Sequence, residues 1–453
     1  MNAGFILTAE EMRAAEARAI EGVTSVETLM QRAGLAAAEA IWRYAGPMPT
    51  LVLCGPGNNG GDGYVIARAL AARGVPVQLA ALGKPATQAA LWARGLWQGD
   101  VATLGEARPA PLLVDALFGT GLRRPLDPDT AARLAALAIA SRLRVAVDLP
   151  SGAATDDGAL LSSVPDYELT VTFQTLKPSH LLHPAARYMG KVVVADIGIE
   201  AQSGLVRLGR PLLRAPAPDD HKYSRGYVAV VAGGMPGAAA LAAVAAMRAG
   251  AGYVRLISDA PVTGTPNAIV QGGLRDLGDK RLGAIAIGPG LGRGDAAAER
   301  LRRVRRAGAP LVIDADGLFA LADRPRDFGG AILTPHEGEF RRLFADLPGS
   351  KVERARAAAR ASGAVIVYKG ADTIIAAPDG RAAIETPPSW LATAGSGDVL
   401  TGIAAARRAA GLEAFEAACE AVWLHARAAA LAGPAMIADD IAARLPDSLA
   451  ECL

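Results

Sequence analysis

The sequence predicts two α/β domains in tandem, and three observations support this prediction. Short apolar runs alternate with helical stretches along most of the chain, which is typical of sheets covered by helices. The runs are apolar throughout rather than at every second residue, as expected for parallel strands buried on both faces. A proline-rich segment at 207–220 interrupts the pattern once, and the alternation then restarts. We therefore expect an N-terminal domain over residues 1–213 and a C-terminal domain over residues 214–453.

Two helices precede the first strand of the N-terminal domain. A Thr8-x-x-Glu11 capping box opens a helix that should end near Gly22, and a second helix at 26–44 stops before Gly46-Pro47. Their alanine-rich faces offer a subunit contact, and we expect a homo-oligomer. Six strand candidates follow, with helices between them: Thr50–Cys54, Val75–Leu82, Pro111–Leu117, Arg144–Leu149, Glu168–Phe173 and Lys191–Ile197. This order predicts a doubly wound, Rossmann-like sheet.

The C-terminal domain repeats the alternation without repeating the sequence. Seven strand candidates have helical stretches between them: Tyr227–Ala232, Tyr253–Ile257, Ala284–Ile287, Pro310–Ile313, Ala331–Leu333, Val365–Tyr368 and Thr373–Ala376. We therefore predict a second α/β fold. No internal duplication is supported.

Composition excludes several classes of partner. The 453 residues are 51% hydrophobic and 20% charged, so both domains can bury a core. The net charge of +2 and the lack of a basic run with interleaved aromatics argue against nucleic acid. Cys54, Cys419 and Cys452 are too scattered for a disulfide framework or a zinc site, which fits a reducing cytoplasm.

Neither a leader nor a membrane span is expected. Thr8 to Ala19 alternates acids and bases where a signal peptide would be apolar. Residues 226–247 are uncharged and long enough to cross a bilayer, but Gly233 to Gly237 break the run in its middle. This segment is better explained as a buried strand, a turn and a helix of small residues.

The first strand leads into a glycine-rich loop. Gly55, Gly57 and Gly60 fit Gly-x-Gly-x-x-Gly, which suggests a dinucleotide site. Such a site needs an acid about 20 residues further on, and residues 77–83 contain none. The loop instead adds side-chain oxygens to its backbone amides, from Asn58, Asn59 and Asp62, and could hold a phosphate and a hard cation together.

Polar residues also follow the other strands of this half. Asp115 precedes a loop with two arginines, Asp148 lies at the end of the fourth strand candidate with Ser151 just after it, and Lys177 follows the fifth. Ligands of open α/β sheets bind outside the carboxyl ends of the strands, so these side chains predict one site. A single aspartate in such a place would more often be a helix cap.

Three motifs carry a resemblance over most of residues 1–210. Gly-Pro-Gly-Asn-Asn-Gly-Gly-Asp-Gly, Asp-Ala-Leu-Phe-Gly-Thr-Gly-Leu and Val-Asp-Leu-Pro-Ser-Gly, in this order, resemble the NAD(P)H-hydrate epimerase family. The resemblance implies that the hydrated nucleotide is held by Asp148 and by Asn58, Asn59, Gly60, Gly61, Asp62, Gly119, Thr120, Gly121, Leu122, Arg123, Arg124 and Pro125. It also implies a potassium ion at Asn59, Asp115 and Ser151. We expect Asp148 and Lys177 to be the acid and base pair. Ser179 stands where a glycine is common in that family.

The C-terminal half has its own loops of small and polar residues. They include Gly233–Ala238, Gly288–Gly292, Thr334–Glu339, Lys369–Thr373 and the turn Gly395-Ser396-Gly397-Asp398. The turn and the helix behind it can direct backbone N–H groups at an anion. Asp398 can be read as an acid in the first turn of a helix or as a base that acts on a hydroxyl beside a phosphoryl group.

The order of these loops resembles the ADP- or ATP-dependent NAD(P)H-hydrate dehydratases, which belong to the ribokinase-like superfamily, over residues 220–453. The resemblance implies substrate contacts at Ala238, Gly290, Gly292, His336 and Asp398. It further implies binding of ADP or ATP, accompanied by Mg²⁺, at Lys369, Gly370, Ala371, Asp372, Thr373, Gly395 and Gly397. Ala394 and Ser396 stand where Gly and Thr are more frequent in that family.

Together the two resemblances imply a bifunctional cytoplasmic enzyme that repairs hydrated NADH and NADPH. Two alternatives remain at this point. A ribokinase-type small-molecule kinase fused to a nucleotide-sensing module would accumulate a phosphorylated product. A non-catalytic binding protein would bind ligand without turnover.

Overall fold

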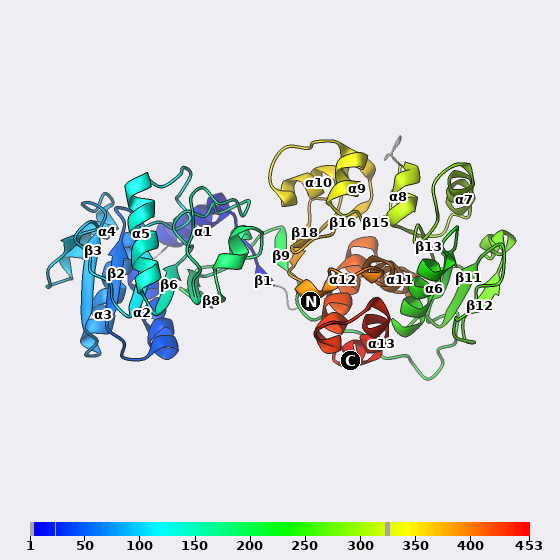
Figure 1. Ribbon diagram of the computed structural model, residues 1–453, viewed down its shortest axis with the longest axis horizontal. Helices are drawn as coiled ribbons and strands as arrows, with labels where there is room; N and C mark the ends of the chain where they lie inside the picture. Colours follow the sequence, from blue (N-terminus) through cyan, green and yellow to red (C-terminus); the bar gives the residue numbers. More distant parts are fainter. Residues whose placement is uncertain (1–3, 23, 322–326) are drawn as a thin grey trace. The chain divides into compact units, whose positions relative to one another are not determined.

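A computed structural model describes residues 4–22, 24–321 and 327–453 (Figure 1). The chain forms two compact units, an N-terminal unit of Gly4–Ser203 and a C-terminal unit that comprises Gly204–Leu453. Leu208 and Leu213 contribute to the core of the C-terminal unit. The expected division between residues 213 and 214 stays a prediction.

The N-terminal unit contains a sheet of seven described strands in the order β4-β3-β2-β5-β6-β7-β8, and neighbouring strands are parallel. The strands are β2 (Thr50–Cys54), β3 (Val77–Ala81), β4 (Ala102–Thr103), β5 (Leu112–Ala116), β6 (Leu143–Val147), β7 (Leu169–Phe173) and β8 (Lys191–Ala195). All six strand candidates are confirmed. The edge strand β4 was missed because two residues show no periodicity.

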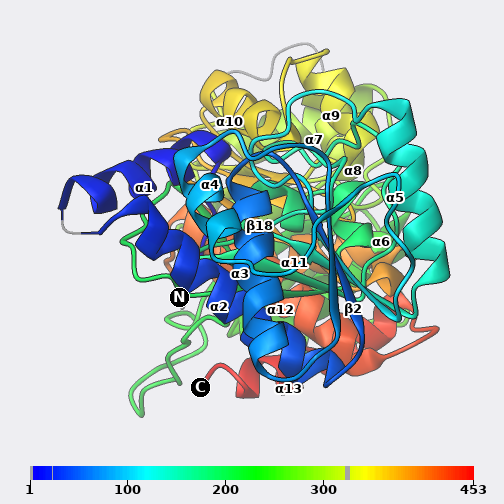
Figure 2. The same cartoon turned by 90° about the vertical axis from the view of Figure 1, so that its left-hand side faces the viewer.

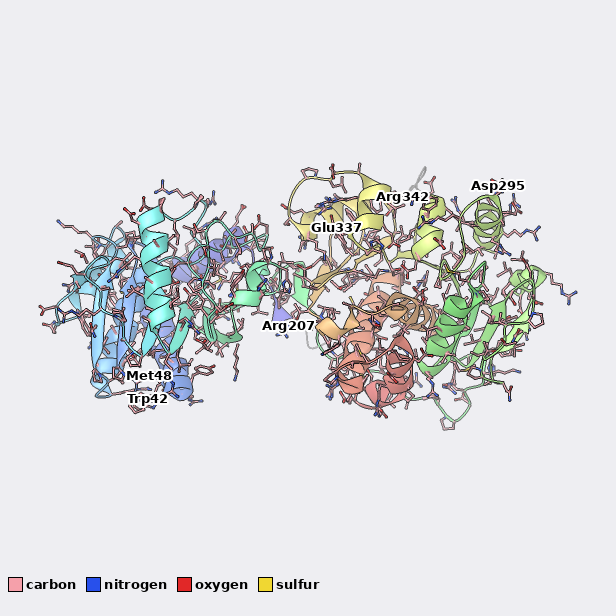
Figure 3. The ribbon with its side chains drawn as sticks, in the orientation of Figure 1. Trp42, Met48, Arg207, Asp295, Glu337 and Arg342 are labelled. Carbon is pink, nitrogen blue, oxygen red and sulfur yellow. The ribbon has the colours of Figure 1, made fainter. Side chains whose placement is uncertain are left out.

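Helices cover both faces of this sheet. They are α1 (Ala9–Gly22), α2 (Val26–Ala45), α3 (Asn58–Ala72), α4 (Gln88–Gly95) and α5 (Pro128–Ala140). Side chains of α1 to α4 share one core with Val52 and Val114, whereas α5 packs on Leu51 and Leu113 from the opposite face. Figure 2 shows α3 and α5 on opposite sides of β2. In Figure 3, Trp42 and Met48 mark the C-terminal end of α2 and the turn behind it.

The strand order reverses beside β2, which has β3 on one side and β5 on the other. The segments that leave β2 and β5 meet there, because Gly55 N donates to Ala116 O at 3.0 Å. A Cβ on Gly55 would lie 1.8 Å from Leu117 O, so only glycine fits this crossing. Such a switch point is where open α/β sheets bind ligands.

The C-terminal unit is built on a larger, mixed sheet. Its strand order is β9-β18-β17-β16-β15-β14-β13-β10-β11-β12, in which β17 is antiparallel to both neighbours. The strands are β9 (Leu205–Arg207), β10 (Tyr227–Val231), β11 (Tyr253–Ile257), β12 (Val270–Gly272), β13 (Ala284–Ile287), β14 (Leu311–Ile313), β15 (Ile332–Leu333), β16 (Val365–Tyr368), β17 (Thr373–Ala376) and β18 (Ala382–Glu385). The seven candidates are confirmed. The three-residue strands β9 and β12 and the four-residue strand β18 were missed.

Two groups of helices flank this sheet (Figure 1). The first group shares the main core with the sheet and consists of α6 (Pro236–Arg248), α11 (Ser396–Ala409), α12 (Ala414–Ala432) and α13 (Ala438–Ala450). The second group consists of α7 (Asp295–Arg306), α8 (Ala315–Leu321), α9 (Glu337–Phe344) and α10 (Lys351–Ser362). The uncharged segment at 226–247 forms β10 and most of α6, as expected. No helix in the described residues is both long and apolar enough to cross a bilayer.

Small residues let α6 and α11 pack at short range. A Cβ on Gly402 of α11 would lie 2.1 Å from Ala242 O and 3.0 Å from the Ala245 Cβ of α6. The backbones of the two helices are therefore close enough to exclude even a methyl group at this point.

We predict that Gly402→Ala lowers the free energy of unfolding by about 1–3 kcal/mol, because overpacking outweighs the better helix propensity of alanine. Gly237→Ala in the first turn of α6 is the matched control, since a Cβ there meets no atom within 4 Å. Urea denaturation of both variants measures the difference. Equal stability of the two variants would contradict the close packing.

Candidate active sites

The glycine-rich segment of the N-terminal unit is a helix start rather than a free loop. Helix α3 begins at Asn58, so the predicted side chains lie in its first turns. A Cβ on Gly60 would lie 1.8 Å from Gly55 O, which explains the tight glycine spacing. Asn58 is exposed and accepts a hydrogen bond from Thr87 Oγ1 at 2.6 Å. The backbone N–H groups of this turn are available to an anion.

A buried ion pair lies at the carboxyl ends of β6 and β7. Lys177 Nζ is 2.9 Å from Asp148 Oδ1, and both side chains are at least 92% buried. Lys177 also donates to Thr172 Oγ1 and Phe173 O at 2.8 and 2.9 Å. Its three donors are therefore all used. The structure thus brings together the two residues that the sequence suggested as acid and base.

Asp148 is held as a carboxylate. Its Oδ2 accepts from Thr120 N at 3.0 Å, and its φ of 64° is unusual for a residue other than glycine. Burial alone would raise the pKa of Asp148, but Lys177, His180 and the hydrogen bonds together lower it below its ordinary value. The group is therefore ionised at neutral pH.

His180 supports this pair and was missed in the sequence. Its Nδ1 accepts from Lys177 N at 2.8 Å, and its Nε2 therefore donates to Asp148 O at 2.8 Å. Burial and the Lys177 charge lower the pKa of His180 to about 4, so the ring is neutral. The only signal in the sequence is its place three residues after Lys177.

Other carboxyl groups lie close enough to act on this pair. Burial raises the pKa of Asp62 well above its ordinary value, and the charges of Asp148 and Glu16 add to the shift. Burial also raises the pKa of Glu16, which belongs to α1, while Lys177 opposes the shift. Glu16 was not predicted, because nothing in the first helix marks it as part of a site.

The segment from Gly119 to Pro125 borders the same place. A Cβ on Gly119 would lie 2.7 Å from Asp148 Oδ2 and 3.0 Å from Asn59 Oδ1, so these three residues meet. The Nδ2 atom of Asn59 is buried and has no hydrogen-bond partner in the described residues. Arg123 and Arg124 are exposed further along this segment.

Asp115 forms a separate buried group with Ser151. Asp115 is fully buried and accepts from Leu117 N, Ser151 N, Ser151 Oγ and Tyr167 Oη at 2.6 to 3.1 Å. Burial raises the pKa of Asp115 despite these bonds. No Lys or Arg of the described chain lies within 4.0 Å of its carboxylate. Tyr167 was not predicted. Within the described ranges no group of three or more His, Cys, Asp or Glu side chains is placed to hold a metal ion.

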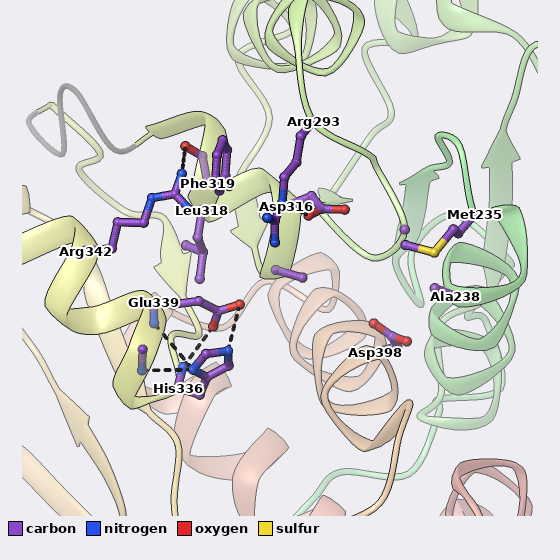
Figure 4. Close-up of a pocket in the computed structure, with 13 residues that line it drawn as sticks. Met235, Ala238, Arg293, Asp316, Leu318, Phe319, His336, Glu339, Arg342 and Asp398 are labelled. Atoms are coloured by element: carbon purple, nitrogen blue, oxygen red, sulfur yellow. Dashed lines mark hydrogen bonds and ion pairs between the residues drawn. The ribbon is translucent and has the colours of Figure 1, made fainter.

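The C-terminal unit has a cavity of about 480 Å³ beside the start of α11 (Figure 4). Four of the predicted substrate residues line it, namely Ala238, Gly290, His336 and Asp398. The fifth, Gly292, does not line it, but Gly292 N donates at 2.9 Å to Oδ2 of Asp316, which does. Gly290 has a φ of 59°, and a Cβ there would lie 2.1 Å from Met235 O. The loops after β10 and β13 are thus pressed together by their glycines.

His336 is the N-cap of α9. Its Nδ1 accepts from Gly338 N and Glu339 N at 3.0 and 3.3 Å, so the ring proton lies on Nε2. Glu339 completes the capping box by accepting from His336 N at 2.9 Å. The capping role and a place in the cavity wall are therefore compatible. The Nε2 atom lies 3.4 Å from Glu339 Oε1, so a ligand would compete with this carboxylate for the Nε2 proton.

Asp398 lies in the first turn of α11 and faces the cavity (Figure 4). Within the described residues its carboxylate has no hydrogen-bond partner. Burial raises the pKa of Asp398 to about 6, and the charge of Asp314 adds to the rise while Lys369 opposes it. An aspartate that only capped the helix would have a lowered pKa, because hydrogen bonds from backbone N–H groups favour the charged carboxylate.

A second ion pair joins a buried aspartate to a partly buried lysine near Asp398. Lys369 Nζ is 2.7 Å from Asp314 Oδ1, at the carboxyl ends of β16 and β14. Thr401 Oγ1 is 2.9 Å from Asp314 Oδ2. A Cβ on Gly397 would lie 3.3 Å from Lys369 Nζ and 3.4 Å from Asp314 Oδ2, so this pair lies against the turn that starts α11. Lys369 was predicted for nucleotide binding, whereas Thr401 was not predicted.

The rest of the predicted nucleotide segment follows β16. Lys351 Nζ is 2.6 Å from Asp372 Oδ1 and 4.7 Å from the centroid of the Tyr368 ring. A Cβ on Gly370 would lie 2.5 Å from the same Nζ. Lys351 thus joins a segment in which sequence analysis indicated only Lys369 as a cation.

The fold and the sites define a chain with two α/β units, each with a buried aspartate paired to a lysine at the carboxyl ends of its strands. Residues 26–179 match the family described as YjeF-related protein N-terminus, and residues 228–450 match the family described as NAD(P)H-hydrate dehydratase. A ribokinase-like superfamily protein from Enterococcus faecalis has the same fold as the C-terminal unit. It is 24% identical, with a TM-score of 0.51 and coverage of 56% of this chain and 98% of its own.

Two similar proteins extend over nearly the whole chain, and both are named bifunctional NAD(P)H-hydrate repair enzyme Nnr. The protein from Moorella thermoacetica is 36% identical over 94% of this chain and 92% of its own length. The protein from Escherichia coli is 34% identical over 93% of this chain and 88% of its own. The chain belongs to the family of bifunctional NAD(P)H-hydrate repair enzymes.

We predict that Lys177→Met destabilises the protein by about 3–5 kcal/mol at pH 7, because Asp148 is left buried without its cation. The pKa of Asp148, now lowered, would rise above its unfolded value. The native variant would then take up a proton as the pH falls, and its deficit against the natural protein should shrink toward pH 5.

Urea denaturation at pH 7 and pH 5 measures this deficit. The exposed Lys84→Met is the matched control and should stay close to the natural protein at both values. A deficit of Lys177→Met that is the same at both pH values would show that Asp148 does not depend on Lys177.

Proposed function

We propose that the N-terminal unit interconverts the R and S epimers of hydrated NADH and NADPH. The C-terminal unit would dehydrate the S epimer at the expense of ADP or ATP, with release of AMP or ADP and phosphate. The observation that carries the proposal is Asp398, a carboxylate with raised proton affinity that faces a cavity from the N-terminus of a helix. A base that acts beside a phosphoryl group needs these properties.

In the dehydration, Asp398 would accept the proton of the substrate hydroxyl as this oxygen attacks the terminal phosphate of the nucleotide. The N–H groups of the Gly395 to Gly397 turn would stabilise the charge on the transferred group. The phosphate would then leave with the hydroxyl oxygen, and loss of a ring proton would restore the double bond. Lys369, paired with Asp314 beneath the turn, is close enough to balance this charge.

Substrate and nucleotide would lie on different sides of the turn. Ala238, Gly290 and His336 line the cavity and would contact the hydrated ring, and Gly292 would contact it from the neighbouring loop. His336 would turn its Nε2 proton from Glu339 Oε1, 3.4 Å away, to the substrate. The segment from Lys369 to Thr373 would hold the nucleotide, together with Gly395 and Gly397.

In the epimerisation, Asp148 would take and return the proton of the same hydroxyl. A carbon that bears both a hydroxyl and a ring nitrogen inverts when its C–N bond opens and recloses on the other face. Lys177 would be the matching acid, and it must exchange one of its three hydrogen bonds to act. Asn58 to Asp62 and Gly119 to Pro125 would bind the nucleotide part of the substrate.

Two cations belong to the proposal. A buried Asp115 carboxylate without a cationic partner in the described chain suits potassium, which Asn59, Asp115 and Ser151 would hold. The ion would neutralise this charge, and it would replace one of the four hydrogen bonds of Asp115. Mg²⁺ would enter with the nucleotide and be held chiefly by its phosphate oxygens.

The surroundings of the enzyme are part of the same proposal. The three cysteines are unpaired and buried, which is consistent with a reducing cytoplasm. A homo-oligomer remains our expectation, with small-molecule substrates and no nucleic acid or membrane partner.

The two activities should separate by mutation. Asp398→Ala is expected to lose nucleotide-dependent dehydration and to keep epimer exchange, because only the C-terminal site loses its base. Asp148→Asn is expected to dehydrate the pure S epimer normally and to stop exchange of R and S. Chromatography of both epimers during the reaction measures both rates.

Each variant is the control of the other. Loss of both activities in a folded Asp398→Ala protein would contradict two separate sites. Normal exchange of R and S by Asp148→Asn would contradict the assignment of the epimerase activity to this site.

The pH dependence of dehydration should report the base. With a pKa of about 6, Asp398 becomes a carboxylate, and activity should rise, as the pH increases through 6. Asp314→Asn keeps an acceptor for Thr401 but removes the negative charge that favours protonation of Asp398. The acid limb of kcat/KM should therefore move to lower pH, and an unmoved limb would mean that another group is titrating.

A further inference from the structure

The cavity in the C-terminal unit carries two arginines on the wall that lies away from Asp398. Arg293 and Arg342 line the cavity together with Phe319, and Figure 4 shows both guanidinium groups beside this ring. They are the only Lys or Arg side chains that line this cavity in the described chain. Neither was predicted as a site residue.

Arg342 is placed by α9 and by the ring. Its Cζ lies 3.0 Å from the centroid of the Phe319 ring, and Nη2 lies 3.5 Å from Phe319 O. No carboxylate of the described residues lies within 4.0 Å of this guanidinium. Its bond to Phe319 O is the one hydrogen bond that it makes to the described residues, so its other donors are available to a ligand in the cavity. A guanidinium that is held in place by stacking on a ring presents a fixed fork of donors, which suits an anionic group such as a phosphate.

Arg293, unlike Arg342, has a carboxylate as its partner. Its Nε is 3.1 Å from Asp316 Oδ1, and its Cζ lies 4.5 Å from the centroid of the Phe319 ring. Asp316 also accepts from Gly292 N, so this ion pair holds the Gly288–Gly292 loop against α8. Arg293 thus serves mainly to fix the wall, and Arg342 carries the uncompensated charge.

The substrate in our proposed function carries its negative charge far from its reacting ring. Hydrated NADH has a pyrophosphate, and hydrated NADPH has a further phosphate on its adenosine ribose. If the ring lies at Asp398, these groups must lie toward another wall of the cavity. Arg is the side chain best suited to bind phosphate through two parallel N–H bonds.

We propose that Arg342, stacked on Phe319, binds a phosphate group of the dinucleotide substrate in the C-terminal site. This inference rests on the proposed function. It does not extend to the phosphates of ADP or ATP, which we assign to the segment at 369–373 on another part of the site. Arg342 is therefore a determinant of substrate affinity rather than of the phosphoryl transfer step.

The test compares Arg342→Ala with Arg341→Ala in the full chain. Arg341 is the neighbour on α9, is exposed, pairs with Glu337 at 2.6 Å and does not line the cavity. Figure 3 labels Glu337 and Arg342 on this helix. Initial rates with hydrated NADH, hydrated NADPH and ADP give kcat and KM for each substrate.

Arg342→Ala should raise the KM for the hydrated dinucleotide about ten- to a hundredfold, as expected for a lost charge-assisted hydrogen bond, with kcat and the KM for ADP little changed. Arg341→Ala should behave as the natural protein. An equal rise for hydrated NADH and NADPH would assign Arg342 to the pyrophosphate. A rise confined to hydrated NADPH would assign it to the additional phosphate.

Arg342→Gln keeps most of the side chain against Phe319 and should show the same rise, which separates lost charge from lost packing. The inference is overturned if Arg342→Ala and Arg341→Ala have the same KM for both dinucleotides, or if only the KM for ADP rises. Failure of the natural protein to dehydrate either substrate would instead reject the proposed function itself.

Discussion

A buried carboxylate must be compensated by a cation or by hydrogen bonds, and this constraint organises both units of the chain. Asp148 pairs with Lys177 in the N-terminal unit, and Asp314 pairs with Lys369 in the C-terminal unit. In each unit the aspartate and the lysine follow different parallel strands. Because the carboxyl ends of such strands meet at one edge of a sheet, the fold itself brings the charges together. In the function that we propose, the chemistry of each unit is built around its pair.

The two pairs have different consequences for the carboxylate that we propose as a base. Asp148 is itself a member of its pair, so Lys177 lowers its pKa and keeps it ionised. Asp398 lies outside its pair, and the negative charge of Asp314 helps to raise its pKa to about 6. The arrangement around Asp148 favours a carboxylate that stays ionised, whereas the arrangement around Asp398 favours a group that gains and loses a proton near neutral pH.

The central strands and both candidate sites could be predicted from the sequence. Continuous apolar runs locate the strands, and the polar residues that follow the runs locate the candidate sites. The edge strands β4 and β12 and the short β9 could not be predicted, because two or three residues give no periodicity, and the four-residue β18 was missed as well. Tyr167 and Glu16 were missed for another reason, because each reaches its site by tertiary contact from a segment without a motif. His180 lies three residues after Lys177, but its contact with Asp148 O depends on the fold. The same holds for Arg342, which looks like any exposed helix arginine until α9 is packed beside Phe319. Asn58 was expected in a loop and lies in the first turn of α3.

The central claim is that one chain holds two sites, only one of which uses a nucleotide. The most direct measurement follows both epimers of hydrated NADH on the natural protein, with and without ADP or ATP. Without nucleotide, R and S should equilibrate and no NADH should form; with nucleotide, both epimers should be converted completely to NADH and free phosphate. The account would be contradicted if exchange of R and S required nucleotide, or if part of the R epimer remained unconverted in the presence of nucleotide.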